Sequence, residues 1–285
     1  MSSIGYLGPE GTYSEKAALL YSAKGEAALT PCPTMESVGK MVSAGVLTHG
    51  VLPLENSCEG TVVRVLDLLA KNKGLSIIGE VIVPVRHHLL ARPGTTIENI
   101  NLVLSHPQAL AQCSEFLSKY LPKAKLQEVV STAGAARIIS ECSSGVAAIG
   151  NSQAGARYHL VRICENIQDM EENYTRFVVI GKEDPGEAQQ AQEEYKISLL
   201  IHIHDRQGAL YGILRQFALG GINLTKIESR PARTRLGEYI FFIDLDGHLG
   251  DPIIHQALRE VEKLTMELRI LGCYPKHQQK FAELD

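Results

Sequence analysis

Several features that mark common protein classes are missing from this sequence of 285 residues. No stretch approaches about 18 uninterrupted apolar residues, the length that indicates a membrane span. Residues 1–6 contain no charged segment followed by an apolar run, so we expect no signal peptide. No Cys-x-x-Cys pair or metal-ligand spacing occurs, which indicates reduced thiols in a cytoplasmic protein. The cysteines are Cys32, Cys58, Cys113, Cys142, Cys164 and Cys273.

An excess of basic residues is also missing. The formal net charge is −4, which argues against a nucleic-acid partner because phosphate binding needs a basic face. A small anionic substrate remains compatible, since it needs only a few well-placed donors. The composition, 45% apolar and 21% charged, is typical of a globular chain, and the length suits about two domains.

Cofactor and metal motifs are incomplete. The glycine-bearing segment 8–15 (GPEGTYSE) opens a helix and suits an anion, although it could equally be a structural turn. It has neither a Walker lysine nor the spaced glycines of a dinucleotide site. His202 and His204 share one face of a predicted strand but lack further ligands, so we expect no metal and no cofactor. His87 and His88 point to opposite faces, so at most one can reach a cleft.

The first 180 residues alternate short apolar runs with helical patterns. Strand-like segments at 4–7, 49–54, 75–85 and 102–104 are followed by polar turns and helices, with Thr12, Thr34 and Ser105 as candidate helix caps. This repetition predicts an α/β fold with a mostly parallel sheet, in which ligands bind beyond the carboxyl ends of the strands. Polar clusters lie at those ends, at 55–57, 105–108 and 131–132, and a further cluster at 173–177 enters the strand predicted at 177–180.

A polar segment with Pro and Gly at 182–194 is typical of a linker. The order predicted after it is strand (196–204), helix (210–219), strand (222–229), strand (238–245), helix (253–264) and strand (267–271). This βαββαβ order is ferredoxin-like and predicts a second domain.

Six motifs taken together resemble those of one enzyme family. Segments 8–15, 52–60 (LPLENSCEG), 105–113 (SHPQALAQC) and 173–177 (NYTRF) are similar to the ordered signatures of prephenate dehydratases. Segments 208–210 (GAL) and 227–231 (IESRP) resemble the two regulatory motifs of that family. The resemblance extends from about residue 4 to residue 272, and we see no segment of the chorismate mutase type, so the chain resembles the monofunctional form.

The resemblance implies a division of the chain into four parts. Residues 1–181 would form a catalytic domain of two lobes with a cleft between them, similar to type 2 periplasmic-binding-protein folds. Residues 182–194 would be a linker, 195–274 a regulatory ACT domain, and 275–285 a tail. Such an enzyme would act without a cofactor, as a homodimer or homotetramer, with no membrane or nucleic-acid partner.

The implied reaction is conversion of prephenate to phenylpyruvate with loss of water and carbon dioxide, in phenylalanine biosynthesis. The resemblance assigns catalysis to Thr175, which would hydrogen-bond the departing hydroxide, and to Arg176, which would hold a substrate carboxylate. Glu55 would orient other groups or take part in a proton relay, and the sequence does not choose between these roles. The remaining substrate contacts would be Asn56, Ser57, Ser105, Thr132 and Phe177.

The resemblance also implies feedback inhibition by L-phenylalanine bound to the ACT domain. The residues expected to bind it are Gly208, Ala209, Leu210, Asn223, Leu224, Thr225, Glu228 and Ser229. Two other functions remain open at this point. One is an arogenate dehydratase, because arogenate shares the ring chemistry of prephenate. The other is a two-lobed binding protein without catalysis, because fold alone does not decide function.

Overall fold

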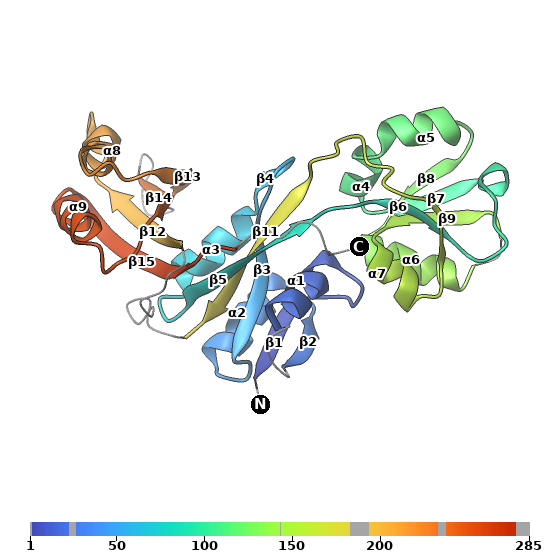
Figure 1. The fold of residues 1–285 in the computed structure, drawn as a ribbon, viewed down its shortest axis with the longest axis horizontal. Coiled ribbons are helices and arrows are strands. Elements are labelled where there is room, and N and C mark those ends of the chain that lie inside the picture. The colour runs from blue at the N-terminus through green and yellow to red at the C-terminus, as the bar shows by residue number, and fades with distance from the viewer. Residues whose placement is uncertain (1, 23–26, 143, 183–193, 233–237, 278–285) are drawn as a thin grey trace.

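The computed structural model describes residues 2–22, 27–142, 144–182, 194–232 and 238–277. They form three β-sheets arranged in a row along the longest axis of the molecule (Figure 1). Most of the predicted linker and the end of the predicted tail lie outside the described residues. No helix in the described part of the chain is long and apolar enough to cross a membrane.

The first sheet occupies the middle of the row. Its strand order is β2-β1-β3-β11-β5, and the short β4 pairs with β3. Apolar side chains of helix α1 cover one face of this sheet, and those of helices α2 and α3 cover the other. The strands are β1 (Ser3–Leu7), β2 (Ala28–Cys32), β3 (His49–Asn56), β4 (Gly60–Thr61), β5 (Ser76–Pro84) and β11 (Tyr174–Gly181). The helices are α1 (Tyr13–Ser22), α2 (Met35–Ser43) and α3 (Val63–Lys71).

The second sheet has the order β10-β6-β9-β7-β8 and also carries helices on both faces. The chain enters it after β5 and leaves it after β10, so it passes twice between the two sheets. The strands are β6 (His88–Ala91), β7 (Leu102–Ser105), β8 (Lys125–Glu128), β9 (Val146–Gly150) and β10 (Val161–Cys164). The helices are α4 (Pro107–Ala111), α5 (Ser114–Tyr120), α6 (Thr132–Ser140) and α7 (Ser152–Arg157), with a 3-10 turn at Ile97–Asn99.

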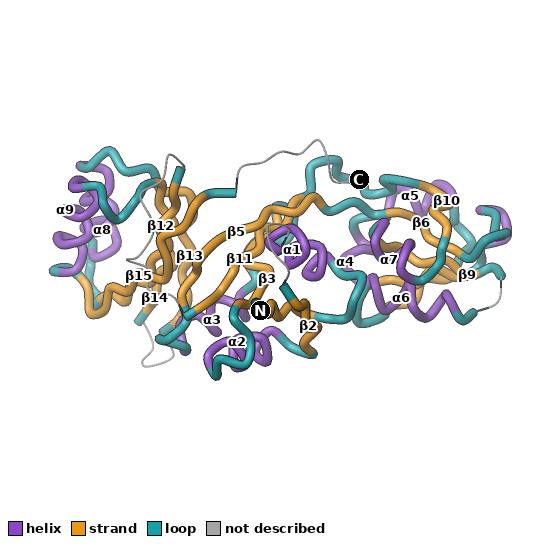
Figure 2. Tube along the Cα trace, turned by 60° about the horizontal axis from the view of Figure 1, so that its bottom comes forward, coloured by secondary structure: helices purple, strands orange, loops and turns teal. Residues whose placement is uncertain are grey.

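The third sheet is antiparallel and has the order β13-β14-β12-β15. Helices α8 and α9 lie together on the face that points away from the first sheet (Figure 2). The sequence of elements is the βαββαβ order that was predicted. The elements are β12 (Tyr195–Ile203), α8 (Ala209–Leu219), β13 (Leu224–Pro231), β14 (Tyr239–Asp246), α9 (Pro252–Glu262) and β15 (Thr265–Pro275).

The inner face of the third sheet packs directly on the first sheet. Leu200, Phe242 and Leu271 join one apolar cluster with Ile180 of the first sheet and Leu69 of helix α3. Strand β15 approaches β5 so closely that a Cβ on Gly272 would lie 2.0 Å from the Ile77 carbonyl oxygen. Only glycine therefore fits at position 272.

Two local expectations are confirmed and two are wrong. Thr12 and Thr34 cap α1 and α2, each accepting a backbone N–H with its hydroxyl oxygen. The cap of α4 is His106 and not Ser105, which ends β7 instead. The sheets are mixed and not mostly parallel, because the strands next to the two passages run against their neighbours.

Candidate active site

A cavity of about 420 Å³ opens between the first and second sheets, where the two passages of the chain lie. Its apolar wall includes Leu7, Pro53, Val85 and Phe177. The N-termini of α1 and α6 reach it from opposite sides through Thr12–Ser14 and Ser131–Thr132. No lysine or arginine is among its lining residues in the described part of the chain. Its polar residues include Asn56, Glu59, Thr61, His87, His106, Gln108, Gln112 and Thr175.

Four of the eight residues predicted for catalysis and substrate binding line this cavity. They are Asn56, Thr132, Thr175 and Phe177. Asn56 and Thr175 are cross-strand partners at the ends of β3 and β11. A register shift after Arg176 pairs Phe177 with Pro53 and leaves Leu54 as an extra residue in β3. This irregularity lets Pro53 and Asn56, an odd and an even position, face the same cavity.

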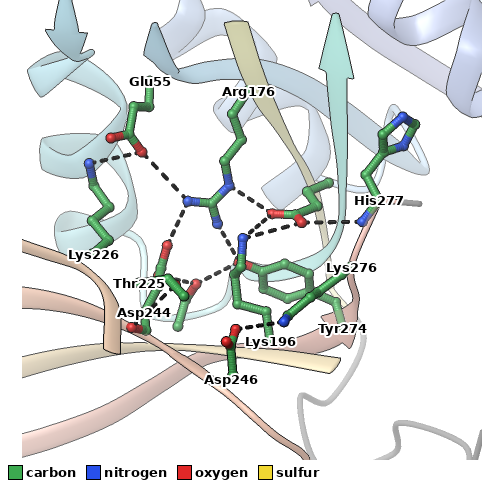
Figure 3. A network of polar contacts seen from close by, with 12 residues as sticks. Glu55, Arg176, Lys196, Thr225, Lys226, Asp244, Asp246, Tyr274, Lys276 and His277 are labelled. Carbon is green, nitrogen blue, oxygen red and sulfur yellow. Dashed lines mark hydrogen bonds and ion pairs between the residues drawn. The ribbon is translucent and has the colours of Figure 1, made fainter. Parts of the chain in front are cut away.

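Arg176 and Glu55 form the next cross-strand pair and therefore point to the opposite face of the sheet. On that face the Arg176 guanidinium is hydrogen-bonded to other side chains of the protein (Figure 3). Its Nε donates to Glu80 Oε2 over 2.7 Å, its Nη1 to Asp244 Oδ2 over 2.6 Å and its Nη2 to the Tyr274 hydroxyl over 2.8 Å. The predicted role of Arg176 as a clamp for a substrate carboxylate does not fit this placement, because no free fork of donors faces the cavity.

The acidic partners of Arg176 are also buried. Lys196 shares Glu80 with Arg176, at 2.9 Å from Oε2, and the Glu80 side chain is only 2% exposed. Burial alone would raise the pKa of Glu80, but Arg176 and Lys196 hold it below its usual value. This buried ionic cluster of Arg176, Glu80, Asp244 and Lys196 joins β11 and β5 to the third sheet.

The other three predicted contacts also lie outside the cavity. Ser105 is fully buried, and its hydroxyl donates to the carbonyl oxygen of Ile149 over 2.7 Å, which ties β7 to β9. Ser57 accepts the N–H of Tyr174 at the start of β11. Glu55 lies 3.2 Å from Lys226 of the third sheet. These residues hold the walls of the site and do not face it.

A chain of side-chain hydrogen bonds runs along the cavity from Thr175 to His87. Asn56 Nδ2 donates to Thr175 Oγ1 (2.9 Å) and to Asn173 Oδ1 (2.8 Å). Asn173 Nδ2 donates to Gln112 Oε1 (3.1 Å), and His87 Nε2 lies 3.1 Å from the same oxygen. Gln112 directly follows helix α4, which packs on the second sheet, so the chain of hydrogen bonds connects the two walls of the cavity.

Two backbone amides fix the orientation of Asn56. The N–H groups of Cys58 and Glu59 both donate to Asn56 Oδ1 over 3.0 Å, so the opposite atom must be the nitrogen. The Thr175 oxygen therefore accepts a hydrogen from Asn56. Among the described residues no group accepts the hydrogen of the Thr175 hydroxyl itself, which leaves it available to a molecule in the cavity.

His87 is the histidine of the adjacent pair that lines the cavity, whereas His88 bonds Ser152 and the backbone of Asn166. The His87 side chain is buried, and burial lowers its pKa from 6.5 to about 4, against a smaller opposite effect of its bond to Gln112. The ring is therefore neutral near pH 7.

Acidification should destabilise the folded chain through His87. Between about pH 6.5 and pH 4 only the unfolded state takes up the proton, so the contribution is complete above 6.5 and is lost as the pH falls. Linkage gives a loss of about 2 kcal/mol between about pH 7.5 and pH 5. Urea unfolding at both pH values should show a correspondingly smaller loss in His87→Asn, and equal losses in the two proteins would contradict this prediction.

The residues predicted to bind phenylalanine do not form one pocket within the chain. Gly208, Ala209 and Leu210 line a cavity of about 290 Å³ at the N-terminus of α8, where Gly208 has φ +75°. Asn223, Leu224 and Thr225 follow the other end of this 11-residue helix, about 16 Å away. Glu228 points instead toward the first sheet and accepts a hydrogen bond from Thr61, and Ser229 is exposed on the strand β13.

Sequence reasoning missed several residues of the cavity, including Tyr13, His106, Gln108 and Gln112. Three of them lie within the motif 105–113, of which only Ser105 was predicted to contact the substrate. No three His, Cys, Asp or Glu side chains in the described residues gather in a way that could hold a metal ion.

Comparisons with known proteins decide the family. Residues 4–185 match the prephenate dehydratase family. The chain belongs to this family. Among its relatives, a prephenate dehydratase of Methanocaldococcus jannaschii is 39% identical over 274 residues, which cover 95% of this chain and 97% of the relative. An arogenate dehydratase/prephenate dehydratase of Arabidopsis thaliana is 38% identical over 285 residues, covering 95% of this chain and 72% of the relative.

A solved structure extends the match to nearly the whole chain. The prephenate dehydratase of Arthrobacter aurescens in complex with L-Phe superposes with a TM-score of 0.88 and 34% identity, over 96% of this chain and 90% of that chain. The protein is therefore an enzyme that converts prephenate to phenylpyruvate, as the resemblance of the motifs implied. The alternative of a binding protein without catalysis is wrong.

Proposed function

We propose that Thr175 stabilises the hydroxide that leaves prephenate by donating its hydroxyl hydrogen to it. One observation supports this role above all others: Asn56 occupies the Thr175 oxygen as a donor, so the hydroxyl hydrogen is free and Thr175 lines the cavity. A threonine hydroxyl is a weak acid, so the role is a positioned hydrogen bond and the proton that completes water comes from solvent.

The electron flow needs no oxidant or reductant. The bond from the ring to its carboxylate breaks, carbon dioxide departs, and the electron pair enters the ring. The carbon–oxygen bond at the opposite ring position breaks at the same time, and the hydroxide takes one proton to leave as water. The ring becomes aromatic, which supplies the driving force.

The apolar part of the cavity suits this decarboxylation. A lysine or arginine beside the ring carboxylate would stabilise its charge and slow its departure, and none lines the cavity in the described residues. Phe177 and Val85 offer a surface for the ring, where a carboxylate is poorly solvated. The pyruvyl carboxylate then binds to neutral donors, of which Thr132 at the N-terminus of α6 is the best placed.

We also propose that the third sheet is the ACT domain and that L-phenylalanine bound to it inhibits the reaction. The pocket at Gly208–Leu210 lies at the N-terminus of α8, where the positive end of the helix dipole suits an amino-acid carboxylate. A second copy of the chain would supply Asn223–Thr225, in a homodimer or homotetramer. The relative that superposes on this chain was crystallised with L-Phe.

A direct contact supports coupling between the third sheet and the cavity. The hydroxyl of Thr61, which lines the cavity, accepts from Lys226 Nζ over 2.7 Å and donates to Glu228 Oε2 over 2.9 Å. Lys226 and Glu228 both belong to β13. A shift of β13 on binding of the effector would therefore move Thr61 and, with it, the wall of the cavity.

Phenylpyruvate formation, followed by its absorbance in alkali, tests the two proposals together. We expect turnover of prephenate by the wild type and strong suppression by L-phenylalanine. Lys226→Met should keep its turnover within a few-fold and still bind phenylalanine in calorimetry, but should lose part of the inhibition because Thr61 keeps only one of its two bonds to β13, the one to Glu228. Full activity of the wild type at saturating phenylalanine would overturn the regulatory proposal and leave the catalytic one intact.

Arogenate is a second candidate substrate because one group in the cavity favours it. Glu59 is the acidic residue that lines the cavity, and an ammonium group would pair with it better than a keto group. Comparison of kcat/KM on the two substrates decides the preference.

A further inference from the structure

In the hydrogen-bonded chain from Thr175 to His87, each bond has a defined donor and a defined acceptor. This direction of donation is set from both ends of the chain. At one end the backbone amides of Cys58 and Glu59 orient Asn56. At the other end Gln112 Nε2 lies 3.4 Å from Glu59 Oε1, and an ionised carboxylate can only accept. Gln112 therefore presents its nitrogen to Glu59 and its oxygen to Asn173 and His87.

Asn173 is the central member of this chain. It is only 2% exposed, and it is the one residue that accepts from Asn56 and donates to Gln112. An ionised carboxylate cannot replace the amide here, because it has no hydrogen to donate to Gln112 Oε1. His87 must then carry its hydrogen on Nε2, and its Nδ1, which has no partner among the described residues, carries a lone pair.

We propose that Asn173 is a positioning residue that holds the Gln112 amide with its N–H groups toward Glu59 and the substrate. This inference rests on the proposed function of the cavity, and it concerns the wall opposite Thr175. An anionic substrate is attracted by amide hydrogens and repelled by an amide oxygen, so the direction of the Gln112 side chain decides whether this wall binds or rejects it.

Asn173→Asp reverses the pattern with almost no change of shape. The ionised carboxylate still accepts a hydrogen bond from Asn56, but its second oxygen faces Gln112 Oε1 and repels it. The Gln112 side-chain amide therefore rotates by half a turn and presents its nitrogen to the carboxylate. We expect kcat/KM to fall about 10- to 100-fold near neutral pH, the range for disrupting a buried hydrogen bond. Asn173→Ala removes both bonds but lets Glu59 and His87 keep Gln112 in place, so its loss should be smaller. A merely structural role predicts the opposite order.

The pH profile of Asn173→Asp gives a second readout. A protonated carboxyl group has one donor and one acceptor, as the amide of Asn173 has, so kcat/KM relative to the wild type should recover as the pH falls. Asn173→Ala should show no recovery. The titratable groups near this position are His87 and Glu59, each connected through Gln112, together with Tyr13 against the His87 ring and Arg86, which donates to the Glu171 carbonyl.

The His87 tautomer in the wild type tests the direction of the chain without any variant. Nitrogen-15 NMR of histidine-labelled protein near pH 7 should show the hydrogen on Nε2. A hydrogen on Nδ1 would overturn the proposal, and so would a smaller loss in Asn173→Asp than in Asn173→Ala. Failure of the Thr175 mechanism is distinguishable, because it appears as near-normal turnover in a Thr175 variant and leaves the His87 tautomer unchanged.

Discussion

Replacing Thr175 with alanine should lower kcat about 100- to 1000-fold and leave KM nearly unchanged, the effect of losing one hydrogen bond made in the transition state. Substrate binding is retained because the apolar wall and Thr132 remain in place. Steady-state kinetics on prephenate measures both constants, and the folded state of the variant is checked by its unfolding transition.

Matched variants at the same position separate the hydroxyl from the shape. Thr175→Ser keeps the hydroxyl and its bond from Asn56 and should retain most of the activity. Thr175→Val keeps the shape without the hydroxyl and should be as impaired as the alanine variant. Near-normal turnover in the valine variant would remove Thr175 from the mechanism.

Replacing Arg176 with methionine should destabilise the folded chain by about 3–5 kcal/mol, the cost of leaving a buried charge without its partner. Glu80, whose side chain is 2% exposed, would keep Lys196, but Asp244, whose side chain is 5% exposed, would lose its ion pair and keep only the hydroxyl of Ser198 as a side-chain partner. Urea unfolding measures the loss. A control is Arg157→Gln, because the pair of Arg157 with Glu10 has side chains 43% and 44% exposed and should contribute less than about 1 kcal/mol.

A second variant identifies the cause of that loss. Arg176→Met combined with Asp244→Asn removes one charge of each sign and leaves the pair of Glu80 and Lys196, so it should be more stable than Arg176→Met alone. If Arg176 bound a substrate carboxylate instead, the single variant would keep its stability and show a raised KM. That result would restore the role that the motif first implied.

The alternation of residues along a strand explains why Arg176 and Glu55 lie outside the cavity. Thr175 and Arg176 are neighbours in one motif, and so are Asn56 and Glu55, but neighbours in a strand face opposite sides. The alternation of side chains along a strand could have shown that Thr175 and Arg176 face opposite sides of the sheet. It could not show which side holds the cavity, because that depends on where the second and third sheets pack.

Gln112 and His87 show a different limit of sequence reasoning. They lie far from Asn173 along the chain and approach it because the chain passes twice between the first and second sheets. Likewise, the Thr61 hydroxyl meets Lys226 and Glu228 because the third sheet packs beside β3. Contacts of this kind follow from the packing of sheets and leave no periodic signal in the sequence.

The sequence by itself determined the family, the βαββαβ order of the last part and the caps at Thr12 and Thr34, because motifs, periodicity and capping are local properties. The tertiary structure decided which polar residues share the cavity and turned Arg176 from a predicted substrate ligand into the centre of a buried ionic cluster. The physical reason is that burial and hydrogen-bond direction depend on the groups that packing brings together.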